Sequence, residues 1–254
     1  MQKSIIITGA SSGIGKALAY EYAARGCNLG LIDIKGELLK KIKIDIEKNS
    51  SNKETVVEIN ELDVSDYEKL AIVLQKMAED LGGIDVVIAN AGIGGYRLIG
   101  EGSFEKDQRI IGTNLLGAMA TIDAAVRVFK QTGGGHIVGI SSISSVRGLP
   151  YMAASSASKA GLNIYLEATR CEVKKYNIVV TTIYPGTVDT PLHIDNKYEP
   201  FKISAENAAK LIVRKIDKKV RTATIPFFPW RLIGLAYKMI PDSVLLNTKE
   251  KMKE

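Results

Sequence analysis

The chain has 254 residues, of which 46 % are hydrophobic and 24 % charged, with 23 Gly and 7 Pro. This composition is that of an ordinary folded protein and excludes disordered and low-complexity classes. The only cysteines are Cys27 and Cys171, and the two histidines are far apart in the sequence, so we expect no disulfide framework, no metal and a reducing compartment.

The formal charge of +6 is concentrated near the C-terminus. Residues 202–254 hold 12 Lys and Arg against 5 Asp and Glu, a net +7, whereas residues 1–201 hold 22 against 23. No nucleic-acid-binding motif accompanies this basic segment, so we expect no nucleic-acid partner. The sequence has no signal-peptide pattern at its start and no apolar run of spanning length, which predicts a cytoplasmic protein.

Short β-branched runs alternate with amphipathic helical stretches, which is typical of a parallel sheet covered by helices. The expected strands are Ser4–Thr8, Asn28–Ile32, Thr55–Leu62, Val86–Ala89, His136–Ile140 and Ile178–Tyr184. The expected helices follow Ile14, cover Glu37–Lys48, follow a capping box of Ser65 and Glu68, cover Ser103–Gln131 and Ala153–Tyr176, and begin after Ser204.

This order predicts an α/β fold, a doubly wound, mostly parallel Rossmann-type sheet with helices on both faces, in one domain. Residues 1–200 form its dinucleotide-binding and catalytic core. Residues 201–254 form a C-terminal helical extension of the same domain, basic and apolar in character.

A glycine-rich loop, Thr8-Gly9-Ala10-Ser11-Ser12-Gly13-Ile14-Gly15, joins the first strand to the first helix. Glycines at such a turn let backbone N–H groups approach a pyrophosphate at the helix N-terminus. A Walker A motif is excluded because Ala17 stands where Ser or Thr would hold magnesium. The segment also fits G-x-S-x-G, so a serine hydrolase with His136 remains a remote alternative.

The spacing T-G-x-x-x-G-I-G, together with Asn90-Ala91-Gly92 after the fourth strand, resembles the short-chain dehydrogenase/reductase family up to about residue 195. The resemblance implies a nicotinamide cofactor. Asp33 closes the second strand, where a carboxylate binds the adenosine ribose and repels a 2′-phosphate, so NAD is expected rather than NADP. The implied cofactor-binding residues are Gly9, Ser11, Ser12, Gly13, Ile14, Gly15, Asp33, Asp63, Val64, Asn90, Ala91, Gly92, Lys159, Pro185, Gly186, Thr187 and Val188.

The family's catalytic set of Asn, Ser, Tyr and Lys matches this chain at all positions but one. By resemblance, Asn114 orders a water relay, Ser142 binds the substrate oxygen, and Lys159 binds the nicotinamide ribose and lowers the tyrosine pKa. The tyrosine should lie four residues before Lys159 and thirteen after Ser142, and both counts reach Ser155. An aliphatic hydroxyl is a far weaker acid than a phenol, so turnover is expected to be severely impaired.

Three functions compete on this sequence. They are an NAD(P)-dependent oxidoreductase acting on a secondary alcohol and its ketone, a catalytically silent NAD-binding or sensing protein, and a serine hydrolase. Tyr151, four residues before Ser155, is an alternative acid, although Pro150 predicts that it precedes the helix.

The substrate pocket is expected along residues 93–99, 146–152 and the loop after Pro191, which together supply mainly apolar side chains. These include Tyr96, Leu98, Leu149, Tyr151 and Met152, while Arg97 and Arg147 are expected at the surface. These apolar side chains, with no pair of arginines to bind a carboxylate or phosphate, indicate an apolar alcohol or ketone substrate, and we expect a homodimer or homotetramer. The amphipathic segment Trp230–Ile240 is expected either to pack over the pocket or a partner subunit or to contact a membrane surface.

Overall fold

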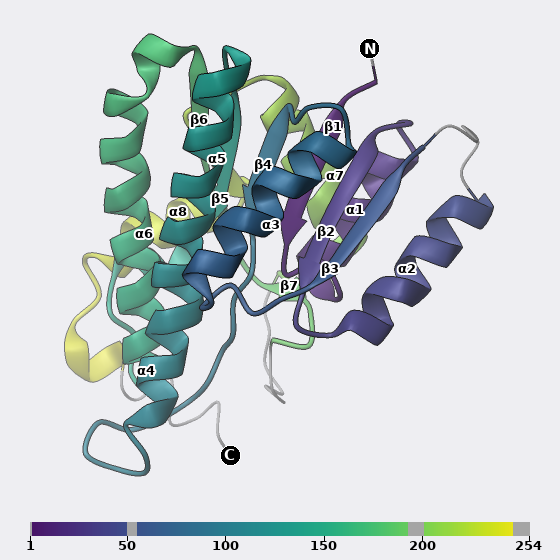
Figure 1. Ribbon diagram of the computed structural model, residues 1–254. Coiled ribbons are helices and arrows are strands. Elements are labelled where there is room, and N and C mark those ends of the chain that lie inside the picture. Colours follow the sequence, from purple (N-terminus) through teal and green to yellow (C-terminus); the bar gives the residue numbers. More distant parts are fainter. Residues whose placement is uncertain (1, 50–54, 193–200, 246–254) are drawn as a thin grey trace.

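Seven parallel strands form the central sheet in the computed structural model, which describes residues 2–49, 55–192 and 201–245 (Figure 1). The strands are β1 (Ser4–Thr8), β2 (Asn28–Asp33), β3 (Val57–Glu61), β4 (Val86–Ala89), β5 (Gly135–Ile140), β6 (Ile178–Pro185) and β9 (Thr222–Ile225), in the order β3-β2-β1-β4-β5-β6-β9. Strands β7 (Val188–Asp189) and β8 (Ile203–Ser204) pair separately. The order reverses between β1 and β4, and at such a point a crevice opens beyond the carboxyl ends of the strands.

Helices cover both faces of this sheet. They are α1 (Gly13–Ala23), α2 (Gly36–Asn49), α3 (Tyr67–Asp80), α4 (Glu105–Ile111), α5 (Ala118–Thr132), α6 (Ala153–Glu172), α7 (Ala205–Asp217) and α8 (Trp230–Tyr237). One core cluster joins the sheet to α1, α2 and α7 through residues such as Leu18, Leu39 and Ile212. The other joins it to α3, α5 and α6. The predicted doubly wound fold is therefore confirmed.

Four local predictions need correction. The third strand begins at Val57 rather than Thr55, and the cap of α3 is Asp66, whose carboxylate accepts from the Lys69 amide, not Ser65. The helix expected to reach Tyr176 ends at Glu172 and is followed by a 3-10 turn. The long helix expected from Ser103 contains a π-helical turn, Gly112–Gly117, between α4 and α5.

Strand β9 was not predicted. It comes from the C-terminal segment, where the sequence indicated only helices, and it pairs with β6 at the sheet edge. The expected capped helix is present as α7, whose first turn is capped by the Ser204 hydroxyl, which accepts from the Asn207 amide at 3.2 Å. Along the described chain, every helix is too short or too polar to span a bilayer.

Candidate active site

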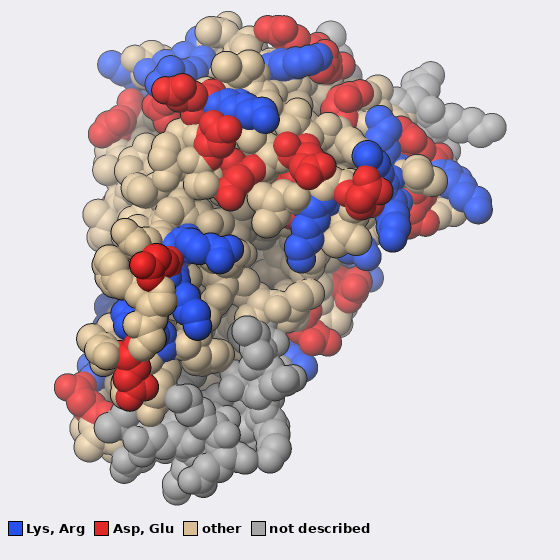
Figure 2. Space-filling view, turned by 60° about the horizontal axis from the view of Figure 1, so that its bottom comes forward, with Lys and Arg blue, Asp and Glu red and all other residues tan. Residues whose placement is uncertain are grey.

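A cavity of about 600 Å³ opens at the carboxyl ends of the strands and collects most of the predicted site residues. With this end of the molecule turned forward, Lys, Arg, Asp and Glu side chains surround a hollow of uncharged residues (Figure 2). The predicted residues that line the cavity are Gly9, Ser12, Gly13, Ile14, Asp33, Asn90, Gly92, Asn114, Ser142, Ser155, Lys159, Pro185, Gly186, Thr187 and Val188. Among described residues, Ser11, Gly15, Asp63, Val64 and Ala91 are not on its wall.

The glycine loop is shaped for close approach of a ligand to the backbone. Gly9 and Gly13 have φ angles of +68° and +50°, which L side chains rarely adopt. A Cβ on Gly15 would lie 2.1 Å from the Gly9 carbonyl oxygen, so the loop closes on itself only with glycine there. Ser12, the N-cap of α1, makes no side-chain capping bond, and the first residues of the helix, Gly13 and Ile14, line the cavity.

Hydrogen bonds of Thr8 and Asn90 join the glycine loop to the residues that follow β4. The Thr8 hydroxyl accepts from the amides of Asn90 and Ala91 at 3.1 and 3.2 Å. The Asn90 Nδ2 donates to the carbonyls of Thr8 and Gly9 at 3.0 and 3.1 Å. Asn90 and Ala91 therefore fix the loop's backbone, and Ala91 needs no contact with the cavity to do so.

We expect Thr8→Val to lower the free energy of unfolding by about 1–3 kcal/mol, because two part-buried amides lose their acceptor while side-chain volume is kept. Urea unfolding measures this difference. Thr8→Ser keeps the hydroxyl and is the matched control. A loss of stability in Thr8→Val no larger than that in Thr8→Ser would contradict the prediction, because only the valine variant lacks the acceptor.

Asp33 is held at the end of β2 with its carboxylate on the cavity wall. Its Oδ2 accepts from the Ser11 amide and its Oδ1 from the Lys35 amide, both at 3.0 Å. The backbone amide of Ser11 therefore orients the Asp33 carboxylate. Asp63 and Val64 lie beyond β3, where Asp63 is exposed and Val64 is buried against Gly117.

The π-helical turn places Asn114 in the interior at 1 % exposure. Its Oδ1 accepts from the Ile93 amide at 2.8 Å, and its Nδ2 donates to the Ile93 carbonyl at 2.9 Å. Asn114 thereby fixes the loop after β4. A Cβ on Gly92 would lie 3.3 Å from Asn114 Oδ1 and 3.7 Å from Lys159 Nζ, so glycine leaves open the space between those groups.

Lys159 is a buried cation on α6. Its Nζ donates to the Ile140 carbonyl at the end of β5 at 2.8 Å. Burial lowers the pKa of Lys159 to about 8, because its ammonium loses solvation. The cavity thus holds an ammonium that is mostly charged near neutral pH and little screened by water.

Ser142 and Ser155 line the same cavity as Lys159. The Ser142 Oγ accepts from the amide of Ser144 at 3.1 Å and from its hydroxyl at 2.8 Å, which leaves the Ser142 proton for another acceptor. Ser155 lies within the first turn of α6, one helical turn before Lys159. The four residues expected from the sequence to form a catalytic set, Asn114, Ser142, Ser155 and Lys159, therefore line one cavity.

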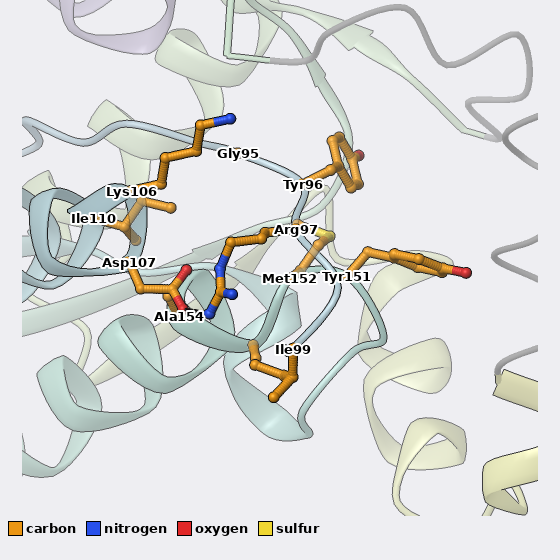
Figure 3. Close-up of a pocket in the computed structure, with 11 residues that line it drawn as sticks. Gly95, Tyr96, Arg97, Ile99, Lys106, Asp107, Ile110, Tyr151, Met152 and Ala154 are labelled. Carbon is orange, nitrogen blue, oxygen red and sulfur yellow. Dashed lines mark hydrogen bonds and ion pairs between the residues drawn. The ribbon is translucent and has the colours of Figure 1, made fainter. Parts of the chain in front are cut away.

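Tyr151 does not reach this cavity. It precedes α6 with a φ of +64° and lines a small neighbouring pocket. Figure 3 shows its ring extending away from the ion pair of Arg97 and Asp107 that borders that pocket. Arg97 was expected at the surface, but its side chain is only 14 % exposed, because it pairs with Asp107 between the loop and α4.

The C-terminal segment closes part of the cavity, which the sequence analysis offered as one alternative. Trp230, Tyr237, Ile240, Val244 and Leu245 line it. A Cβ on Gly186 would lie 2.4 Å from the Trp230 ring, so the indole packs directly against the loop after β6. Burial raises the pKa of Tyr237, which therefore stays neutral on the cavity wall.

Arg147, also expected at the surface, holds this segment in place. Its guanidinium donates to the carbonyls of Tyr237, at 2.7 Å, and Ile240, and pairs with Asp242. These contacts join residues 90 to 95 positions apart, so no local pattern could have identified them. Of the predicted pocket side chains, Tyr96, Leu149 and Met152 line the large cavity, Leu98 is exposed, and residues 193–200 of the substrate loop lie outside the described residues.

The hydrolase alternative finds no support in the geometry. Ser11 is buried at the carboxyl end of β1, whereas His136 lies near the start of β5, at the opposite edge of the parallel sheet. The His136 Nε2 is 2.9 Å from the Thr181 hydroxyl, and burial lowers the pKa of His136 to about 4. The two side chains are not placed to act together.

Comparison with known proteins finds dehydrogenases and reductases among the proteins that this chain resembles. The family model described as short chain dehydrogenase matches residues 3–199. An uncharacterized oxidoreductase of Mycobacterium tuberculosis is 34 % identical over 242 residues, covering 94 % of this chain and 95 % of that protein. A 3-ketodihydrosphingosine reductase of Bos taurus is 35 % identical over 258 residues, covering 96 % and 77 %. An alcohol dehydrogenase structure from the archaeon Thermococcus sibiricus, complexed with 5-hydroxy-NADP, superposes with a TM-score of 0.79 at 29 % identity, covering 88 % and 95 %.

Proposed function

Because this chain belongs to the short chain dehydrogenase family of oxidoreductases, we propose that it binds NAD(H) and acts on an apolar secondary alcohol and its ketone, with turnover limited by Ser155. The observation that carries this proposal is the shared cavity of Ser142, Ser155 and Lys159 beside the glycine loop. Absorbance of NADH, followed over a panel of hydrophobic alcohols and ketones with this chain and Ser155→Tyr, tests it.

The protein's own groups suit this chemistry. A bound nicotinamide supplies or accepts the hydride. Ser142, whose Oγ already accepts two bonds, directs its proton to the substrate oxygen. Lys159, held by the Ile140 carbonyl, places an ammonium beside the space that Gly92 leaves open, where a ribose hydroxyl fits. Asn114 keeps the Ile93 backbone fixed at that space.

The missing element is an acid that exchanges a proton with the substrate oxygen. The Ser155 hydroxyl has neither the reach nor the acidity of a phenol. Tyr237 lines the cavity, but burial raises its pKa, which opposes ionisation. A catalytically silent NAD-binding protein is the second candidate, and Ser155 is the observation that favours it.

An apolar substrate fits the cavity wall. Ile143, Leu149, Met152, Leu192 and Ile240 contribute to it. The name of the bovine relative gives a keto substrate for that protein, in line with this class. The homodimer or homotetramer and the cytoplasmic location expected from the sequence stay predictions.

We expect NAD(H) to bind more tightly than NADP(H), because the Asp33 carboxylate, fixed by two backbone amides at the end of β2, would repel a 2′-phosphate bound there. Isothermal titration of both cofactors measures the ratio. Trp230 is the only tryptophan of the chain and lines the cavity, so its fluorescence gives an independent binding signal. Asp33→Ala should narrow the ratio, and equal or reversed affinities in the unmodified chain would contradict the assignment.

A further inference from the structure

Helix α8 has two apolar faces. Its inner face is fixed by Trp230 and Gly234, and a Cβ on Gly234 would lie 2.6 Å from Ile143 Cδ1. Its outer face carries large apolar side chains that contact solvent. Together with Phe228 before the helix and Met239 after it, Leu232 and Leu235 of α8 form what we name the apolar stripe, and these four side chains are exposed by 71, 84, 58 and 54 % respectively.

The apolar stripe covers the exposed side of α8 and the turns at its two ends. Leu232 and Leu235 are three residues apart in α8 and so lie on one side of the helix, and Phe228 and Met239 lie in the turns before and after it. Phe227, at 66 % exposure, extends the surface at its start. Isolated exposed apolar residues are ordinary, but a contiguous group of this kind marks an interaction surface.

Cations flank the stripe. Arg231 and Lys238 are exposed and lie on the same side of it by helical position, and neither forms an ion pair within the described chain. Residues 226–241 contain no acidic side chain. The nearest one, Asp242, is already paired with Arg147.

We propose that this face rests on an anionic lipid bilayer, with the apolar stripe among the acyl chains and Arg231 and Lys238 at the lipid headgroups. A second copy of the chain fits less well, because a two-fold contact would bring the like charges of both copies together. The same helix lines the cavity through Tyr237, so a docked molecule would hold the cavity close to the membrane. Bilayer docking itself does not depend on the proposed reaction.

Co-sedimentation with vesicles of one part phosphatidylserine to two parts phosphatidylcholine, at low salt, tests the proposal. The unmodified chain should sediment with them. Leu232→Glu combined with Leu235→Glu should weaken binding by roughly tenfold or more. Arg231→Gln combined with Lys238→Gln should weaken it by about fivefold per charge. Circular dichroism confirms that each variant is folded.

The matched control combines Ile44→Glu with Ile72→Glu, which places the same charges on exposed isoleucines of α2 and α3. It should bind as the unmodified chain does. Absence of sedimentation at low salt would overturn the proposal, as would equal binding by the stripe variant. If light scattering finds a dimer that only the stripe variant dissociates, and no vesicle binding occurs, the face belongs to a second copy.

Discussion

Replacing Ser155 by tyrosine is expected to raise the rate of hydride transfer by about 10²- to 10⁴-fold, or roughly 3–5 kcal/mol of barrier. The new phenol would stand one helical turn before the buried Lys159 ammonium, in the cavity that Ser142 also lines. A nearby cation favours the ionised phenol and lowers its pKa toward working pH. Single-turnover oxidation of NADH with a hydrophobic ketone measures the change.

Ser155→Phe is the matched control, because it adds the ring without its hydroxyl and should leave the rate unchanged. Cofactor affinity should be similar in all three proteins, since Ser155 is not part of the glycine loop. If the unmodified chain is as active as Ser155→Tyr, another residue supplies the proton. Tyr96→Phe and Tyr237→Phe, which change the tyrosines on the cavity wall, and Tyr151→Phe then identify which phenol it is.

The difference in unfolding free energy between this chain and its Lys159→Met variant is expected to rise with pH, by about 3 kcal/mol between about pH 8 and 10.5. Burial lowers the pKa of Lys159 to about 8 in the folded chain, against an ordinary value of 10.5. The unfolded chain therefore binds more protons throughout this window, so folding becomes more favourable as pH increases. Below pH 8 the cost of burying the ammonium is fully present.

Urea unfolding at several pH values measures this dependence. The Ile140 carbonyl loses its donor in the variant at every pH, so that loss shifts the whole curve and leaves the slope unaffected. The matched control is Lys41→Met, which removes an exposed lysine of α2 in the same way. A flat difference for Lys159→Met would mean that the ammonium is solvated in the folded state.

The strands of the sheet could be predicted where each strand has a distinctive local pattern of apolar residues. Strands such as Val86–Ala89 are buried on both sides and are therefore continuously apolar in sequence. Strand β9 lacks this mark, because Thr222 is exposed at the sheet edge and Pro226 follows directly. The π-helical turn was missed for a different reason, since one wider turn hardly changes the apolar periodicity of a long helix.

The residues of the candidate site also fall into those that a local sequence pattern identifies and those that it does not. Glycines, Asn90 and Lys159 stand in motifs whose spacing identifies them, and the structure brings them to one cavity. The tethering of α8 by Arg147 and the burial of Arg97 depend on partners distant in sequence or on a folded loop. Because both side chains are charged, the sequence predicted that both are exposed to solvent. The tertiary contacts in the structure overturn that prediction.

Because strand β9 comes late in the sequence, it also affects the order in which the protein folds during synthesis on the ribosome. The Gly186 amide donates to the Ile225 carbonyl at 2.8 Å, and the Trp230 indole covers the same glycine. Residues 1–185 emerge first and can already pair six strands, since nascent chains fold from the N-terminal end. The loop after β6 gains these contacts only when residues 222–230 follow. The growing chain can therefore form the glycine loop well before it completes the part of the cavity wall that Gly186 and Trp230 provide.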